Sequence, residues 1–338
     1  MPDETTFDGT VLVTGGSGFL GGHTITTLLE HGHRVRTTVR SRRTELPLHD
    51  RVEVVTADLT RDDGWAEAVA GCAYVLHVAS PFPPAQPQDE NDVIVPAVEG
   101  TLRVLRAART AGVRRVVVTS SFAAIGYTPK PDGAPYDEND WTDPEGQSPY
   151  VKSKTLAEHA AWDFAAESPG APELAVVNPV GIFGPVLGTG HATSVAIVAN
   201  LLRGVPPVLP RASFAVVDVR DVADLQLRAM LHPDGAGQRF LAAAGQPLTL
   251  PEVAAILRRL GPGADRVARR TAPDWLVRAA ATRVPALREL AGLLGPPKSV
   301  DTRKAAKVLG WQPRSPEETI SDTGRSLLDR EFDRAAPG

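Results

Sequence analysis

Nine residues decide the fold of this chain: Thr14-Gly-Gly-Ser-Gly-Phe-Leu-Gly-Gly22. A short apolar run at 10–13 precedes them, a helical pattern at 24–31 follows, and a second apolar run covers 34–39. A glycine-rich turn inside a strand–helix–strand unit is typical of a dinucleotide-binding site. The stretch therefore predicts an α/β fold that begins with such a unit.

Three of these glycines are spaced three residues apart, and each has a physical role of its own. Gly15 permits the tight turn, and Gly18 lets backbone N–H groups approach a pyrophosphate. Gly21 permits close packing of the helix on the strand. The spacing therefore predicts that the turn binds the diphosphate of a dinucleotide.

The end of the second strand indicates which dinucleotide binds. NAD sites usually offer an acidic residue there for the ribose 2′-hydroxyl, whereas NADP sites offer an arginine for the 2′-phosphate. Here the strand is followed by Arg40 and, three residues later, by Arg43, and guanidinium groups bind phosphate through paired N–H donors. We therefore predict NADPH as the cofactor, bound by these two arginines, with Asp58 near the adenine amino group.

Further apolar runs alternate with helical patterns, and their short connections predict a doubly wound parallel sheet of the Rossmann type. The remaining strands of the first half are expected at 52–56, 73–79, 113–119 and 174–178. We predict an NADP-binding domain at 1–185, to which 214–243 returns. A smaller, mainly helical substrate-binding lobe is expected at 186–213 and 244–338.

Ligands of doubly wound sheets bind beyond the carboxyl ends of the strands, so side chains at those ends are candidates for the site. The fourth strand is followed by Ser80 and an apolar, proline-rich loop, and the fifth ends in Thr119-Ser-Ser121. We assign Ser80 and Thr119 to the cofactor crevice. The predicted walls of the substrate pocket are Phe82, Tyr127, Leu187 and Phe214.

A phenol and an ammonium group occur together in Tyr150-Val-Lys-Ser-Lys154, at the start of a predicted helix, and their spacing puts both on one helix face. This pair suits hydride transfer from a nicotinamide to a carbonyl. Tyr150 would protonate the oxygen, and Lys154 with an oxidised nicotinamide would lower the pKa of the phenol. Lys154 would also bind the nicotinamide ribose, and Ser121 would donate to the carbonyl oxygen.

The motifs together resemble those of the extended short-chain dehydrogenase/reductases, and among them the dihydroflavonol-reductase-like aldehyde and ketone reductases. The resemblance covers nearly the whole chain. The matching stretches are Thr14-Gly-Gly-Ser-Gly-Phe-Leu-Gly21, Thr38-Val-Arg40, Ala57-Asp-Leu59, His77-Val-Ala-Ser-Pro81, Glu99-Gly-Thr101, Thr119-Ser-Ser121, Tyr150-Val-Lys-Ser-Lys-Thr-Leu-Ala-Glu158 and Asn178-Pro-Val180. The resemblance implies that Ser121, Tyr150 and Lys154 carry catalysis. It implies cofactor contacts from Gly15, Gly18, Phe19, Leu20, Arg40, Asp58, Leu59, Ala79, Pro179, Val180 and Ile182.

The chain departs from the plant members of this group where the substrate is concerned. Dihydroflavonol reductases place an asparagine five residues after the catalytic serine, where this chain has Gly126, and a later glutamine near Ser213. Cinnamoyl-CoA reductases carry Asn-Trp-Tyr-Cys-Tyr at the catalytic tyrosine, where this chain has Gly146-Gln-Ser-Pro-Tyr150. Both substrates are therefore disfavoured, and we predict reduction of a small or apolar aldehyde or ketone to a chiral alcohol.

Two other functions stay open. A nucleotide-sugar epimerase or dehydratase of the extended family would use the same Tyr–Lys pair with bound NAD, but Arg40 and the apolar loop at 81–84 count against it. A non-catalytic NADP-sensing protein belongs to a different class. It would not need a serine, a tyrosine and a lysine in this order.

Composition excludes further classes. The net charge of −4 over 338 residues gives no basic surface for nucleic acid, and no apolar run is long enough to cross a membrane. A single cysteine, Cys72, and the absence of a signal-peptide pattern predict a cytoplasmic location without disulfides. Asp218 and Asp221 are not assigned to a metal, because Asp221 stands where a helix cap is expected. We expect a monomer or homodimer that binds a small-molecule carbonyl compound.

Overall fold

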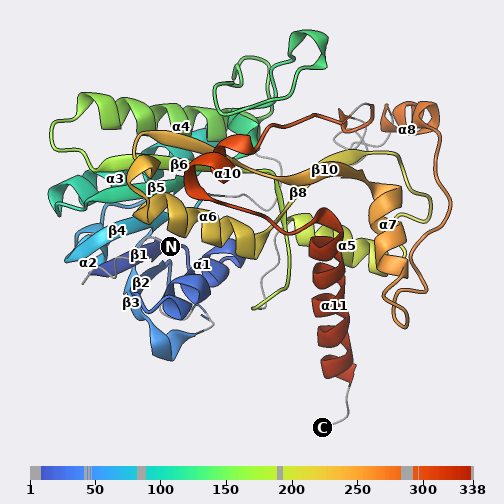
Figure 1. The fold of residues 1–338 in the computed structure, drawn as a ribbon, viewed down its shortest axis with the longest axis horizontal. Coiled ribbons are helices and arrows are strands. Elements are labelled where there is room, and N and C mark those ends of the chain that lie inside the picture. Colours follow the sequence, from blue (N-terminus) through green and yellow to red (C-terminus); the bar gives the residue numbers. More distant parts are fainter. Residues whose placement is uncertain are drawn as a thin grey trace.

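The computed structural model describes residues 9–41, 44, 46, 48–81, 89–188, 193–282, 292–295 and 297–335. A large sheet is covered by helices on both faces, and a smaller sheet with its own helices lies beside it (Figure 1). Among the residues described, none of the helices has the length and apolarity that crossing a bilayer requires.

The main sheet contains, within the described ranges, seven strands in the order β3-β2-β1-β4-β5-β6-β9, and each neighbouring pair is parallel. Their bounds are β1 Thr10–Thr14, β2 Arg34–Val39, β3 Glu53–Thr56, β4 Cys72–His77, β5 Arg115–Thr119, β6 Glu173–Pro179 and β9 Gln238–Ala242. The predicted Rossmann-type fold is confirmed. The strand order reverses between β1 and β4, which is where such sheets bind their ligands.

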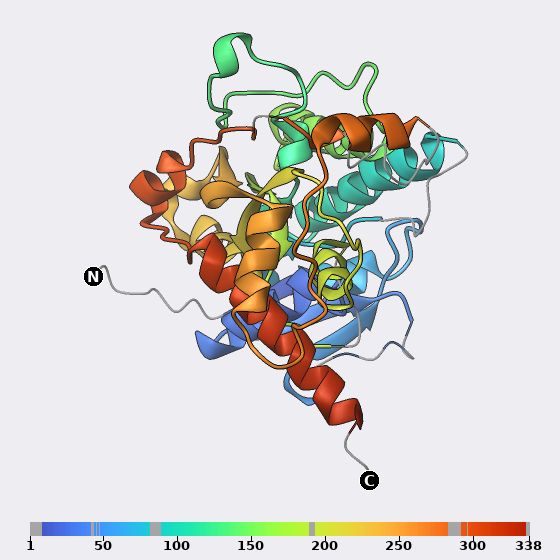
Figure 2. The same cartoon turned by 90° about the vertical axis from the view of Figure 1, so that its right-hand side faces the viewer.

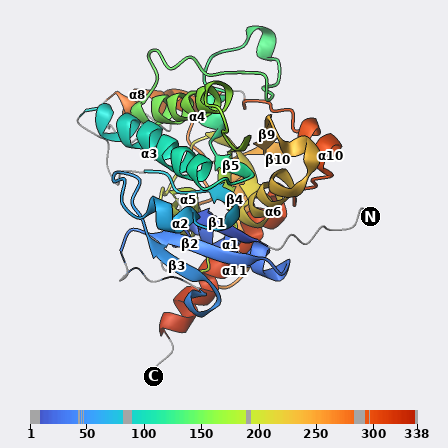
Figure 3. The same ribbon diagram turned by 90° about the vertical axis from the view of Figure 1, so that its left-hand side faces the viewer.

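Helices on both faces explain why the strands read as continuous apolar runs. Val11 and Val13 pack toward α1 (Phe19–Glu30) and α6 (Val219–Leu231), which lie against each other. Leu12, between them, packs toward the opposite face. That face is covered by α2 (Trp65–Val69), α3 (Asn91–Thr110) and α4 (Pro149–Glu167), and Figure 3 shows α3 running alongside α4.

The smaller sheet has the order β10-β8-β7, with bounds β7 Gly181–Phe183, β8 Ser213–Asp218 and β10 Ala244–Thr249. A second apolar core forms around it from α5 (Thr193–Leu202), α7 (Leu250–Arg258), α8 (Asp274–Ala281) and α11 (Pro316–Ala335), as Figure 2 shows from their side. The division into a domain at 1–185 and 214–243 and a second lobe stays a prediction. The structure adds that β7, at the end of the first segment, pairs with β8, at the start of the second, in the smaller sheet.

The C-terminal part of the chain returns to the main domain at two places. Helix α10 (Arg303–Leu309) packs on α6 and β9. Just before it, Tyr136 donates its N–H to the Ser299 carbonyl at 2.9 Å and accepts the Asp301 N–H at 2.8 Å. The loop that follows β5 is therefore held by residues close to the C-terminus.

The glycine turn between β1 and α1 is packed too tightly for side chains. Gly15 has a φ of +72°, which favours glycine. A Cβ at Gly21 would overlap the Gly15 carbonyl oxygen. At Gly22, the next position of α1, a Cβ would lie 3.8 Å from the nearest atom, an ordinary contact distance. Only one of these two neighbouring glycines is therefore required by packing.

Substitution of the two glycines by alanine tests this difference. Gly21→Ala is expected to lower the free energy of unfolding by roughly 1–3 kcal/mol, because the turn must move away from the helix. Gly22→Ala is the matched control and is expected to leave it unchanged or raise it by up to about 1 kcal/mol, because alanine favours helix. Urea unfolding measures both values. Equal stability of the two variants would contradict the packing argument.

Candidate active site

The glycine turn lies where the ends of three strands meet. The Gly15 N–H donates to Thr38 Oγ1 on β2 at 3.2 Å. A Cβ at Gly15 would lie 3.0 Å from Ala79, which follows β4. Three predicted cofactor positions, the turn, the end of β2 and the start of the loop after β4, therefore lie together.

This arrangement fits a dinucleotide diphosphate. A Cβ at Gly18 would lie 3.2 Å from the Gly15 carbonyl oxygen, so the turn leaves little room for side chains beside its backbone. Helix α1 begins after Gly18, and no side chain caps it. An uncapped helix N-terminus attracts anions through its N–H groups and its dipole. Phe19 and Leu20 form the first turn of this helix.

The residues predicted to bind the adenosine end lie beyond β2 and β3. Arg40 is exposed at the end of β2. The Thr60 N–H, 2.8 Å from Asp58 Oδ1, holds the pKa of Asp58 below its ordinary value, with smaller contributions from the Thr60 hydroxyl and the Arg40 charge. Leu59 follows and packs against α3. Two predicted residues lie outside the described part of the chain: Arg43 and Phe82.

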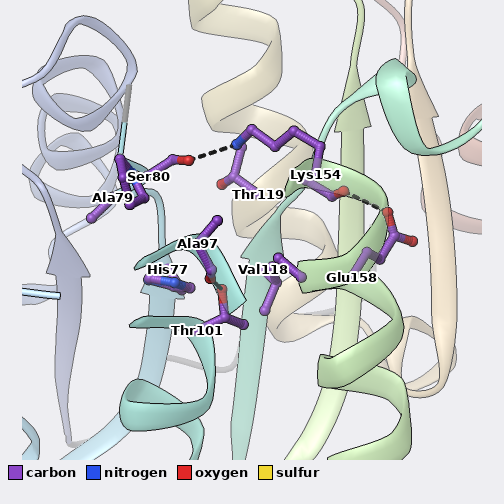
Figure 4. A pocket seen from close by; sticks show the side chains of 12 residues that line it. His77, Ala79, Ser80, Ala97, Thr101, Val118, Thr119, Lys154 and Glu158 are labelled. Atoms are coloured by element: carbon purple, nitrogen blue, oxygen red, sulfur yellow. Dashed lines mark hydrogen bonds between the residues drawn. The ribbon is translucent and has the colours of Figure 1, made fainter. Parts of the chain in front are cut away.

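The three predicted catalytic residues come together at the carboxyl ends of β4 and β5. Ser121 follows β5, and its Oγ accepts the Ala123 N–H at 3.1 Å. The Tyr150 hydroxyl, in the first turn of α4, donates to Ser121 Oγ at 3.5 Å. Lys154 lies one turn further along α4 and donates to Ser80 Oγ at 2.9 Å, as Figure 4 shows.

Burial dominates the electrostatics of this group in the protein without cofactor. Burial raises the pKa of Tyr150, and the hydrogen bond with Ser121 offsets this in part. Burial also lowers the pKa of Lys154 to about 8, against a smaller raising effect of Glu158. We expected Lys154 and an oxidised nicotinamide to lower the pKa of the phenol. In the protein alone burial dominates, and the ammonium group is hydrogen-bonded to Ser80.

A pocket lies beside Lys154, between α3, α4 and the ends of β4 and β5 (Figure 4). Its lining combines one cationic, one anionic and several small polar side chains with apolar ones. The lining residues are His77, Ala79, Ser80, Pro81, Ala97, Thr101, Val118, Thr119, Ser120, Lys154, Ala157 and Glu158.

The model of the NAD dependent epimerase/dehydratase family matches residues 11–243 of the chain. The chain belongs to this family. The cinnamoyl-CoA reductase CAD2 of Medicago truncatula is 34% identical over 268 residues, which cover 75% of this chain and 81% of that protein. Ketoreductase azaE of Aspergillus niger is 31% identical, with 95% of this chain and 98% of that protein covered.

A solved structure with the same fold is the yeast methylglyoxal/isovaleraldehyde reductase Gre2 complexed with NADPH. It has a TM-score of 0.80, is 28% identical, and covers 96% of this chain and 99% of its own. The predicted membership of the extended short-chain dehydrogenase/reductases is confirmed, and this family member is an NAD(P)-dependent oxidoreductase.

The remaining predicted cofactor residues lie at the ends of β5 and β6. Thr119 Oγ1 accepts a hydrogen bond from Gln226 Nε2 on α6 at 2.6 Å, so its hydroxyl is engaged below the crevice. Pro179 is the last residue of β6, and Val180 continues to β7 with its N–H on the Ala242 carbonyl at 3.0 Å. Ile182 lies within β7. Their contacts with the cofactor stay predictions for this family member.

The three described wall candidates lie beside three different elements. Tyr127 is near the start of α4, and the Lys298 ammonium group lies 3.8 Å from its ring centre. Leu187 is exposed and approaches Gly22 of α1. Phe214 stacks on Phe183 in the second core, with ring centres 5.6 Å apart. Their role as pocket walls stays a prediction.

Sequence reasoning missed three buried polar residues behind the site: Glu158, Asn178 and Arg239. Glu158 Oε2 accepts from Asn178 Nδ2 at 2.6 Å, and its Oε1 accepts from Arg239 Nε at 2.6 Å. The i+4 spacing from Lys154 to Glu158 was a signal in the sequence. For Arg239 the sequence contained no signal other than a charged residue within an apolar run.

The two aspartates excluded as metal ligands have other partners. Asp218 is the N-cap of α6, where its carboxylate accepts the Arg220 N–H at 2.9 Å. Our expectation that Asp221 is the cap is wrong, because Asp221 lies inside the first turn and pairs with Arg314. Within the described ranges, no group of His, Cys, Asp or Glu side chains is arranged to hold a metal ion.

His77 at the end of β4 is buried and held in its neutral form. Its Nδ1 lies 2.8 Å from Thr14 Oγ1, which also accepts the N–H groups of Val78 and Ala79. The threonine hydroxyl proton is therefore directed at Nδ1. Burial, with a smaller effect of the Lys154 charge, lowers the pKa of His77 to about 3.

This shift predicts sensitivity to acid. Below the ordinary histidine pKa of about 6.5, the unfolded chain takes up a proton that the folded chain refuses, so the free energy of unfolding falls by about 1.4 kcal/mol per pH unit. The free energy of unfolding continues to fall until the pH approaches 3. Urea unfolding between about pH 4 and pH 6 should show a shallower slope for His77→Asn than for the natural chain. Parallel slopes would exclude His77 as the source.

Proposed function

We propose that this protein is an NADPH-dependent reductase that transfers a hydride to the carbonyl carbon of a small or apolar aldehyde or ketone. The observation that carries the proposal is the 3.5 Å approach of the Tyr150 hydroxyl to Ser121 Oγ, one helical turn from Lys154 and beside the glycine turn. Two hydroxyl groups this close together can both donate to one substrate oxygen, which is what carbonyl reduction needs.

Each side chain has a distinct task in this reaction. The bound nicotinamide supplies the hydride. The Ser121 hydroxyl donates a hydrogen bond to the carbonyl oxygen, and the Tyr150 phenol gives that oxygen its proton, so an alcohol and a phenolate result. The raised pKa of Tyr150 keeps the phenol protonated before the reaction, as reduction requires. The phenolate must take up a proton from solvent before the next turnover.

The preference for NADPH rests on Arg40. It is exposed at the end of β2, close enough to Asp58 to influence the pKa of that carboxyl group, on the side where the ribose 2′-position is expected. A guanidinium group there favours a 2′-phosphate over a hydroxyl group. The solved relative Gre2 is a complex with NADPH, which is consistent with this choice.

The substrate class rests on the surroundings of Gly126. A Cβ at this position would overlap the Phe122 ring, so a side chain there would have to displace that ring. Phe122 in turn packs near Tyr127, with ring centres 6.4 Å apart. Apolar and aromatic groups after Ser121 favour a small or apolar carbonyl compound, in line with the names methylglyoxal/isovaleraldehyde reductase and ketoreductase among the relatives.

The test of the proposal is turnover. The purified protein should oxidise NADPH with members of a panel of aldehydes and ketones. Tyr150→Phe should lower kcat by roughly 10²–10⁴-fold and leave NADPH affinity nearly intact, because the proton donor is lost. Tyr136→Phe is the matched control, since its hydroxyl donates to the Thr128 carbonyl at 2.9 Å. Binding of NADPH without turnover on any substrate would favour the NADP-sensing function.

The cofactor preference is tested separately. Arg40→Ala should weaken NADPH by roughly 10-fold or more, because a charge-assisted phosphate contact is lost, and should leave NADH nearly unchanged. Arg34→Ala, at the opposite end of β2, is the control and should affect neither cofactor. Fluorescence titration of both cofactors provides the dissociation constants. An equal loss for NADPH and NADH would refute the role of Arg40.

A further inference from the structure

Glu158 is a fully buried carboxylate one helical turn after Lys154 on α4. It accepts hydrogen bonds from four side chains. Ser120 Oγ lies 2.5 Å from Oε2, and Asn178 Nδ2 lies 2.6 Å from the same oxygen. Arg239 Nε is 2.6 Å and Trp162 Nε1 is 3.4 Å from Oε1.

These donors connect Glu158 to the backbone on both sides of the site. Ser120 follows β5, and Asn178 on β6 also donates to the Ser121 carbonyl at 3.2 Å. Arg239 on β9 donates to the carbonyl groups of Glu138 and Asp140, at 2.9 and 2.8 Å, in the loop that leads to α4. The carboxylate therefore joins the end of β5, the active-site helix and the loop before it.

A buried ion pair of this kind has a purpose other than stability. Removing two charges from water costs about as much as their attraction returns, so apolar replacements are often as stable. The pair between Glu158 and Arg239 is more than nine-tenths buried on both sides. Its negative member also borders the pocket that Lys154 borders. The pair holds the Glu158 carboxylate in one position and keeps a negative charge there.

We propose that Glu158 is a positioning residue for the reductase reaction described above: it fixes Ser121 relative to Tyr150 and Lys154, and its negative charge keeps Lys154 in the ammonium form. The inference rests on the proposed function for the first role. The second role concerns the protein without cofactor and can be measured without turnover.

The groups around Lys154 determine the sign of the pH effect. The titratable or charged ones in the pocket lining are His77 from β4 and Glu158 from α4. Tyr150 lies one turn before Lys154 on α4, and Arg239 from β9 lies behind the carboxylate. The residues that line the pocket from α3 and from the end of β5 do not titrate; they are Ala97, Thr101, Val118, Thr119 and Ser120. His77 and Tyr150 are neutral near pH 7, and Glu158 raises the pKa of Lys154 against the effect of burial. Removal of this charge therefore lets Lys154 lose its proton at a lower pH.

The first experiment measures the protonation of Lys154 in the cofactor-free protein. The rate of its acetylation is followed against pH by peptide mass spectrometry. In Glu158→Gln the midpoint should move down by about one pH unit, as expected when an opposite charge nearby is removed. Asp221→Asn is the matched control, because Asp221 is a buried carboxylate paired with Arg314 far from Lys154. The control should keep the midpoint of the natural chain.

The second experiment measures NADPH turnover. Glu158→Gln should lower kcat roughly 10–100-fold, as expected of a small misplacement, and shift the alkaline limb of the kcat profile to lower pH with little change in KM. Glu158→Asp retains the negative charge, so it should keep the acetylation midpoint. Its shorter side chain cannot make all the hydrogen bonds of Glu158, so it should lower kcat. If Glu158→Gln does not fold, Glu158→Asp alone decides the positioning role, and a natural kcat in that variant overturns it.

The outcomes separate the two proposals. An acetylation midpoint in Glu158→Gln equal to that of Asp221→Asn overturns the charge role. A kcat equal to that of the natural chain overturns the positioning role. A natural chain without turnover on any carbonyl compound refutes the proposed function, while the acetylation midpoints still test the charge role of Glu158.

Discussion

The close contact between the glycine turn and the first helix sets the geometry on which the rest of the site depends. Because Gly21 carries no side chain, α1 lies against the Gly15 carbonyl group. The N-terminus of the helix then lies at the sheet edge where β1 and β4 end. Ala79 reaches the same turn. A wider turn would move the turn backbone away from Ala79 and from the neighbouring Ser80, to which Lys154 donates.

Helix α4 carries three side chains on successive turns, and each side chain lies in a different chemical environment. Tyr150 is 36% exposed and opens to the cleft, whereas Glu158, two turns later, is fully buried. Lys154 lies between them, with Ser80 as its hydrogen-bond partner. The same helix therefore carries a partly exposed tyrosine, a lysine whose pKa burial has lowered, and a fully buried carboxylate in a hydrogen-bond network. The gradual change in burial along one face is what differentiates the three side chains.

The sequence predicted the features that depend on local pattern. The strand at 34–39 and the helix that carries Tyr150 follow from apolar runs, a glycine turn and a serine–proline helix start, and the structure contains both. The contacts of Arg239 with Glu158 and of Lys298 with the Gly126 carbonyl could not be predicted. These partners are 81 and 172 residues apart, and only the fold brings them together. The raised pKa of Tyr150 in the protein without cofactor could not be predicted for a related reason, since burial is a property of the folded chain.

The contact of Arg239 with Glu158 also constrains the order in which the protein can be made. A ribosome completes α4 well before β9, because Arg239 comes 81 residues after Glu158. Packing α4 onto the sheet without β9 would leave Glu158 with Ser120, Trp162 and Asn178 as donors but without the charge of Arg239, at a cost on the order of several kcal/mol. The ion pair of Glu158 therefore forms only after β9 has been added, and a chain that stops between these two residues lacks the guanidinium group that faces this carboxylate.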